Sequence, residues 1–230
     1  MNSVNLMMMA VAAAVVLVGC SKVEKAGRSV ARKGGEALGK GATEFFNGVD
    51  EGIREVREGS ISDAMTVIKT RKSVRKFDPS KKVSDETLQT ILKAAMCAPS
   101  ALDKRVWEFV VVRDAALLAA IAEKNPYSRV GNGAQAAIIV CGKQEQQGGG
   151  LWVCDCAAAS ENILLAAHAL GLGAVWTALY PDETRAGAIR ELLAIPEGYM
   201  PLNVIPIGYP AENPEPKDKW NPDKIHYDRW

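Results

Sequence analysis

Apolar positions recur with two different periods between residues 60 and 208. Spacings of three and four residues predict helices over 62–71, 85–98, 115–124, 153–170 and 183–194. Short apolar runs predict strands over 107–113, 136–142 and 202–208, and the run 174–179 completes the core. The first two strands are apolar enough to be covered on both faces. The pattern therefore predicts a globular domain that starts near Ser60.

Two of the expected helices have recognisable ends. Ser84 can cap the helix that follows it, and the spacing of Leu88, Ile91, Leu92 and Ala95 gives that helix a buried face. Gly171 and Gly173 follow the longest helix, where glycine commonly ends a helix.

The first twenty residues differ from the rest of the chain. The run from Leu6 to Gly19 is too short to span a bilayer comfortably and ends in small residues, as signal peptides do. Its last residues, LVGC, resemble a bacterial lipobox, which implies that Cys20 is lipidated and anchors the protein to a membrane on the periplasmic or extracellular face. Because MNSVN carries no lysine or arginine, an uncleaved tail or a start assigned too far along stays open. The protein would then be cytoplasmic.

Two further segments flank the expected domain. Residues 21–59 are charged and glycine-rich with a helical stripe, so they form either a partly helical spacer or a basic segment on an anionic membrane surface. Residues 209–230 contain four prolines and end in IHYDRW. Because prolines exclude a helix and aromatic residues seldom close a disordered tail, we expect an extended arm that reaches another surface, such as a second subunit.

Composition and charge narrow the classes of function. The 28 basic residues nearly balance the 27 acidic ones, which argues against a dedicated nucleic-acid-binding protein. Two histidines and scattered cysteines give no metal-ligand spacing, so we predict no metal site. Cys97 and Cys141 lie in apolar runs and are expected to be buried thiols. Cys154 and Cys156 make a weak candidate for a redox pair.

One short segment concentrates positive charge in a nearly neutral chain. RKSVRKFDPS, residues 71–80, places Arg71, Lys72, Arg75 and Lys76 around Ser73. Whether the segment is extended or helical, Arg71 and Arg75 point to the same side. Two guanidinium groups near a hydroxyl suit a phosphate or a polarised carbonyl. A solvated basic turn is the alternative that composition leaves open.

Four motifs, in order and spacing, resemble the nitroreductase family of flavin enzymes, and in particular its short branch. They are RKSVRKF, APSALDKRVW, GLGAVWTALYP and GYPAENPEPKDKW, and the resemblance covers Ser60 to Trp230. It implies an α+β fold, an α-β-α sandwich with a central mixed sheet, and an intertwined homodimer with two FMN molecules at the subunit interface. It also implies that NADH or NADPH donates electrons, which pass in a ping-pong cycle to nitroaromatics, quinones or similar planar acceptors. FMN would then carry the chemistry, with no catalytic side chain.

The same resemblance implies which residues bind FMN. A basic motif would contact its phosphate and the pyrimidine edge of its ring, and a proline–serine motif would come from the partner chain. A third group would lie along the ring, and two lysines of the arm would complete the phosphate cradle. In that order the groups are Arg71, Lys72, Ser73 and Arg75; Pro99, Ser100, Ala101 and Leu102; Trp176, Thr177 and Ala178; and Lys217 and Lys219.

The chain departs from the family pattern after the proline–serine motif. The family often has Asn and then Gln-Pro-Trp, where this chain has Asp103 and then Arg105-Val106-Trp107. An ionised Asp103 could accept a hydrogen bond from flavin N3–H, but its charge would disfavour an anionic reduced ring unless Lys104 or Arg105 offsets it. This departure and the expected export favour an alternative, a membrane-tethered flavin-binding protein without nicotinamide-dependent turnover.

The remaining polar candidates have structural interpretations. His168, on the longest helix, is expected to be a core or interface histidine. Asp155 and Glu161 on the same helix are expected to cap or to form pairs, and Trp107 to lie in the core.

Overall fold

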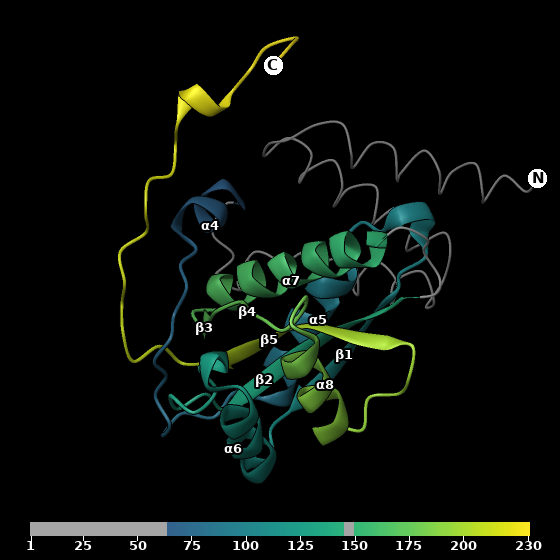
Figure 1. Cartoon of the computed structure of the whole chain (residues 1–230). Helices are drawn as coiled ribbons and strands as arrows, with labels where there is room; N and C mark the ends of the chain where they lie inside the picture. Colours follow the sequence, from purple (N-terminus) through teal and green to yellow (C-terminus); the bar gives the residue numbers. More distant parts are fainter. Residues whose placement is uncertain (1–63, 145–149) are drawn as a thin grey trace, which may run out of the picture. The chain divides into compact units, whose positions relative to one another are not determined.

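The computed structural model describes residues 64–144 and 150–230 and contains a five-stranded sheet with helices on both faces (Figure 1). The strands are β1 (Trp107–Val112), β2 (Ala136–Lys143), β3 (Gly173–Ala174), β4 (Thr177–Ala178) and β5 (Tyr199–Gly208). The helices are α4 (Ala64–Thr70), α5 (Asp85–Met96), α6 (Ala115–Lys124), α7 (Leu151–Ala169) and α8 (Glu183–Leu192). Short 3-10 helices are η1 (Ala101–Asp103), η2 (Pro126–Ser128) and η4 (Pro222–Lys224).

The sheet has the order β1-β2-β5-β3, with β4 also paired to β5. Every pairing among the described strands is antiparallel, so the expected mixed sheet is wrong for this part of the chain. The connection through α6 shows the reason, because Val112 at the end of β1 pairs with Ala137 at the start of β2. The chain therefore returns at the end of the sheet that it left, without the crossover that a parallel pair needs.

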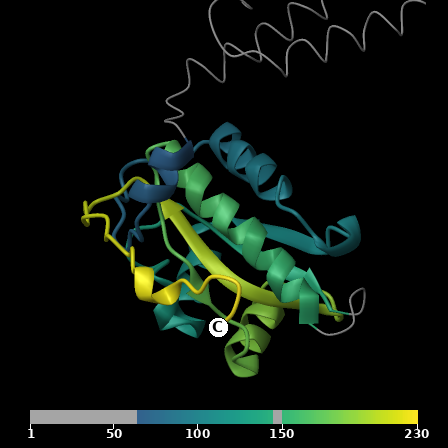
Figure 2. The ribbon, with the colours of Figure 1, turned by 90° about the horizontal axis from the view of Figure 1, so that it is seen from above.

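Two apolar layers enclose the sheet and confirm the α-β-α sandwich. Ile138 and Val140 of β2 pack on the side of α5 and α7, whereas Ala137, Ile139 and Cys141 pack on the side of α6 and α8. This alternation is the two-residue period of a strand covered on both faces. Seen from above, α5 and α7 lie side by side over the sheet (Figure 2).

The edge strand β1 differs from β2. Residues 136–142 are all buried, as expected for a strand covered on both faces. In β1, Glu108 and Val111 are exposed, so the same expectation is wrong there. An apolar run thus marks a strand without revealing whether a neighbouring strand and helix cover it.

Local signals place the helix ends well. The side chain of Ser84 accepts a hydrogen bond from the Thr87 amide at 3.2 Å, which confirms the expected cap of α5. Helix α6 has the expected bounds, and Asp114 caps it. Helix α7 ends at Ala169, and Gly171 follows with φ +73°, a conformation that glycine adopts without strain.

Several predictions fall on residues outside the described ranges. They are the signal peptide 1–20 with lipidation at Cys20, the spacer 21–59, and the domain start near Ser60. Within residues 64–144 and 150–230, no helix combines the length and apolarity that crossing a bilayer requires. The same ranges hold no group of three or more potential metal ligands among histidine, cysteine, aspartate and glutamate.

The four described cysteines are free thiols in two environments. Cys141 and Cys156 are buried, and burial raises the pKa of each thiol to about 12. Cys97 and Cys154 are exposed. The buried position expected for Cys97 is therefore wrong, because α5 ends at Met96 and Cys97 caps it on the exposed side.

Candidate functional site

The basic segment after α4 is attached to β3. The Val74 amide donates to the carbonyl of Ala174 at 3.0 Å, and the Val74 side chain is 3% exposed. Gly173 permits this approach, because a Cβ on it would lie 2.6 Å from Val74 Cγ1. The segment is therefore a packed part of the domain, whereas a solvated turn would leave Val74 in water.

The start of the C-terminal arm covers the other side of this segment. The Asp78 amide donates to the Tyr209 carbonyl at 2.8 Å, and the Ala211 amide donates to the Lys76 carbonyl at 3.0 Å. Phe77 forms a bridge with Pro210. In Figure 2 the arm accordingly runs beside the segment that follows α4.

Two polar side chains of the arm contact the cationic residues themselves. Glu212 Oε1 accepts a hydrogen bond from the Arg75 amide at 2.6 Å. Asn213 Oδ1 accepts from Lys72 Nζ. The arm therefore helps to position the basic segment.

Helix α7 supplies the third support. Glu161 Oε1 lies 3.0 Å from Arg71 Nε, and the Arg71 side chain is only 19% exposed. His168, in the last turn, lies with Nε2 2.9 Å from Thr70 Oγ1. Burial lowers the pKa of His168, and the charges of Lys72 and Arg71 lower it further. These two cations therefore create a positive potential beside the end of α7.

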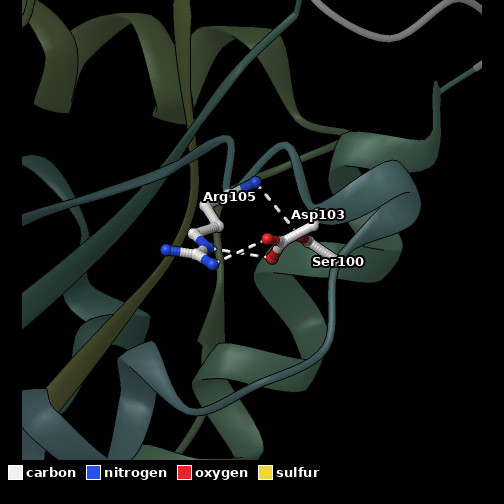
Figure 3. A network of polar contacts seen from close by, with 3 residues as sticks. All are labelled: Ser100, Asp103 and Arg105. Carbon is white, nitrogen blue, oxygen red and sulfur yellow. Dashed lines mark hydrogen bonds and ion pairs between the residues drawn. The ribbon is translucent and has the colours of Figure 1, made fainter. Parts of the chain in front are cut away.

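The loop after Pro99 forms the second group of predicted residues. Leu102, Asp103 and Arg105 all have positive φ, at +54°, +53° and +48°, which is unusual for residues with side chains. Leu102 is 88% exposed. Ser100 Oγ accepts from the Arg105 amide at 3.0 Å and helps to hold this shape (Figure 3).

Asp103 and Arg105 form a two-point ion pair in that loop (Figure 3). Arg105 Nε donates to Asp103 Oδ1 at 2.8 Å, and Nη2 donates to Oδ2 at 2.6 Å. The hydrogen bond from Arg105 and its charge lower the pKa of Asp103, so the carboxylate is ionised and its charge is offset. The arginine that replaces the family's glutamine thus compensates the aspartate that replaces its asparagine.

The two groups lie at different positions along α7. The Ala101 amide donates to Asp155 Oδ1 at 3.0 Å near the start of α7, whereas His168 lies in its last turn. Thirteen residues of helix separate these positions, which is about 20 Å. The loop contact and Thr70 therefore lie far apart along α7, although the Arg71 side chain reaches back to Glu161, six residues or about 9 Å of helix from Asp155.

The third group, Trp176 to Ala178, lies on and beside β4. Thr177 is buried and its hydroxyl donates to the Val204 carbonyl, so its side chain belongs to the sheet. Trp176 is half-buried and Ala178 is exposed. Only these two therefore present side chains to a ligand.

The arm beyond Pro214 carries the last two predicted residues. Lys217 and Lys219 are exposed, and the hydrogen bonds made after Pro214 join residues of the arm to one another. Among the described residues, no hydrogen bond or ion pair joins Lys217 or Lys219 to the basic segment. The arm is extended apart from η4, as the prolines predict.

Several contacts have no clear signal in the sequence. Glu212 and Asn213 lie in a charged, proline-rich stretch that gives no sign of their partners. For His168, the sequence favours a core or interface position. The structure places His168 beside the basic segment. Asp155 and Glu161 pair as expected, and Trp107 is buried as expected.

Comparisons with known proteins agree with this architecture. The model of the nitroreductase family matches residues 68–145 and 123–209. The "Putative NADH dehydrogenase/NAD(P)H nitroreductase" of Methanothermobacter thermautotrophicus is 50% identical over 75% of this chain and 92% of its own length. A crystal structure named likewise, from Bacteroides thetaiotaomicron, is 47% identical, covers 73% of this chain and 98% of its own, and has a TM-score of 0.69. An FMN-dependent nitroreductase of Clostridium difficile is 31% identical over 71% of this chain and 98% of its own, with a TM-score of 0.67. The chain belongs to the nitroreductase family of oxidoreductases.

Proposed function

We propose that the protein is an FMN-dependent oxidoreductase that takes electrons from NADH or NADPH and passes them to nitroaromatics, quinones or similar planar acceptors. The observation that carries this proposal is the basic segment, which contacts with β3, α7 and the arm hold in place. The similarity of the chain to an FMN-dependent nitroreductase supports FMN as the cofactor.

The charges of the segment fit a phosphate group. Arg71 is balanced by Glu161, but the side chains of Lys72 and Arg75 donate to the uncharged oxygens of Asn213 and Ser73. Net positive charge therefore remains on the segment. Arg71, Lys72, Ser73 and Arg75 would hold the phosphate, since charge-assisted hydrogen bonds are the strongest that such groups make.

The protein would act by binding and orienting its ligands. FMN, when bound, supplies hydride acceptance from the nicotinamide and electron transfer to the acceptor. Arg71 and its neighbours fix one end of the cofactor, and Trp176 and Ala178 offer a surface beside it. The Asp103–Arg105 pair presents a polar group of nearly zero net charge. It therefore offsets the repulsion that an isolated aspartate would impose on a reduced, anionic ring.

We further propose that two chains share each site, in a homodimer. The loop 99–103 and the basic segment are supported from different positions along α7, so the loop of a second chain is better suited to meet the basic segment. The arm supports this arrangement, because Trp220, Tyr227 and Trp230 are 73%, 83% and 100% exposed in the single chain. Exposed aromatic side chains of this size commonly mark protein contacts.

Anchoring through a lipid on Cys20 remains a proposal from the sequence. If the domain is exported, nicotinamide is scarce around it, and the physiological donor would be another reductant. Mass spectrometry of the membrane fraction would detect a diacylated or triacylated Cys20 at the start of the mature chain.

The experiment that tests the proposed function is an absorbance spectrum followed by anaerobic addition of NADH or NADPH. We expect flavin bands near roughly 370 and 450 nm that bleach on addition of the nicotinamide. Bands that do not bleach would support the alternative, a flavin-binding protein without nicotinamide-dependent turnover. A colourless protein that takes up no added FMN would contradict the cofactor assignment.

A further inference from the structure

The hydrogen bonds of Thr70 determine where His168 carries its proton. Thr70 Oγ1 lies 2.7 Å from the carbonyl of Thr66 and 2.9 Å from His168 Nε2. A hydroxyl has one hydrogen to donate, and a carbonyl can only accept, so the hydrogen of Thr70 points to Thr66. The Thr70 oxygen must then accept from His168. Neutral His168 therefore carries its hydrogen on Nε2 and leaves Nδ1 without one.

Protonation of His168 consequently leaves this contact intact. The Nε2–H group is present in the neutral and in the charged ring, and the added proton goes to Nδ1. Protonation therefore adds a positive charge to the His168 ring, beside the cations Arg71 and Lys72. Thr70 immediately precedes Arg71, so that charge arises at the start of the basic segment.

The surroundings of His168 oppose its protonation in the free protein. The C-terminal end of a helix favours a positive charge, and His168 lies in the last turn of α7. Burial, Lys72 and Arg71 outweigh this effect and lower the pKa of His168. Glu161, on the same helix, is paired with Arg71, while α5 and the sheet meet α7 mainly through apolar side chains. An anion bound near Arg71 and Lys72 would screen the two cations that disfavour the charged ring.

We propose that His168 is a proton-linked residue of the anion site formed by Arg71 and Lys72, and that it adds a third positive charge when an anion binds. The identity of the anion as the phosphate of FMN rests on the proposed function. Binding then takes up a proton on Nδ1, and proton uptake strengthens binding. Anion affinity rises as the pH falls through the raised pKa of the complex, and levels off below the lowered pKa of free His168.

The test compares the dissociation constant of FMN in wild type, His168→Gln and His226→Gln across about pH 5 to 8. Glutamine keeps an N–H donor for Thr70 but does not titrate, and His226, in the exposed arm, is the only other histidine of the chain. The FMN phosphate itself titrates near pH 6. The decisive quantity is therefore the dissociation constant of the variant divided by that of wild type at each pH. Quenching of flavin fluorescence gives each constant without turnover.

We expect the ratio for His168→Gln to be near one at the alkaline end and about tenfold at the acid end, where wild type binds more tightly. The ratio for His226→Gln should stay near one. A ratio for His168→Gln that does not change with pH would overturn the inference while leaving the cofactor assignment in place.

A second measurement is independent of FMN and of the His168→Gln variant. The imidazole resonances of wild type are followed by NMR against pH, with and without inorganic phosphate, and His226→Gln assigns the signal of His168. Phosphate should raise the pKa of His168. An unchanged His168 titration would contradict the inference even if FMN binds. Failure of FMN to bind at all would refute the proposed function, and the phosphate titration would still decide the role of His168.

Discussion

Residues 71–78 and residues 99–105 carry the two main groups of the expected flavin site, but the structure supports them differently. The first segment contacts β3, the arm and α7, and its apolar residues Val74 and Phe77 are each 3% exposed. The second has three positive φ angles, and its one large apolar side chain, Leu102, points into solvent. Contacts within a single chain hold residues 71–78 in place, whereas residues 99–105 leave an exposed surface.

This difference suggests different roles for the two segments. Strained, exposed backbone persists where a function or a partner requires it. We therefore expect the basic segment to hold an anion by itself, and the loop to meet a second chain. The comparison can be tested by loosening the first segment or by changing the charge of the second.

The largest effect is expected from Gly173→Ala, which would force β3 and the basic segment apart. The added Cβ would lie 2.6 Å from a buried methyl of Val74. We expect a loss of about 1–3 kcal/mol in the free energy of unfolding, as for overpacked cores, and weaker FMN binding. Denaturant unfolding and a flavin titration measure the two.

Gly187→Ala is the matched control for that substitution. Gly187 lies within α8, and a Cβ there would meet nothing within 4 Å. Alanine should stabilise the helix by up to about 1 kcal/mol. If both substitutions were equally harmless, close contact of Val74 with β3 would not be what holds the segment.

Arg71→Ala removes a cation together with its ion pair to Glu161. We expect FMN to bind about 10–100-fold more weakly, since one charge-assisted hydrogen bond would be lost. Riboflavin, which lacks the phosphate, should be unaffected. Arg113→Ala, which breaks an exposed ion pair with Asp85 away from the basic segment, is the control for loss of one arginine charge. Equal losses for FMN and riboflavin would place the phosphate away from Arg71.

Arg105→Gln leaves Asp103 without its compensating charge. The pKa of Asp103 is lowered by Arg105, so the pair is intact above the ordinary carboxyl range and is lost as the pH falls through the lowered value. We expect affinity for reduced FMN to fall about threefold relative to oxidised FMN, because the exposed charges are well screened. Spectroelectrochemical titration measures this ratio. Asp103→Asn combined with Arg105→Gln should restore it, and a double variant resembling the single one would show that the charge of Asp103 is irrelevant.

Thiol labelling leaves stability and FMN binding to one side and distinguishes the cysteines of the core from those on the surface. Burial raises the pKa of Cys141 and Cys156 to about 12, so neither should react in the folded protein near neutral pH. Cys97, just before the loop, and Cys154 should react. Peptide mapping after labelling identifies the modified residues. Rapid labelling of Cys156 without unfolding would mean that α7 does not pack on β2 as described.

Sequence patterns predicted the elements of this fold because helix signals are local. Ser84 and Asp114 cap helices whose apolar periods start beside them. Exposure is a property of the assembled fold, which is why the apolar neighbourhoods of Cys97 and of β1 were misleading. An apolar run cannot show where a helix stops short or which strand forms the edge.

The candidate site was predicted by motif, but its internal contacts were not. The partners of Arg75 and Lys72 lie 137 and 141 positions away in the chain, at Glu212 and Asn213. His168 meets Thr70 across 98 positions. Such pairs depend on how β3, α7 and the arm converge, and no periodicity encodes that convergence. The compensation of Asp103 by Arg105 was accessible from sequence because two residues of one loop make it.

Sedimentation velocity, followed at the protein and flavin absorbance bands over a range of concentrations, tests whether two chains share each flavin site. The proposed arrangement joins the basic segment of one chain and the exposed loop of another in one site. It predicts that flavin absorbance sediments with a species of twice the chain mass and leaves the protein as that species dissociates. Flavin that sediments with the single chain of 24.7 kDa would contradict it.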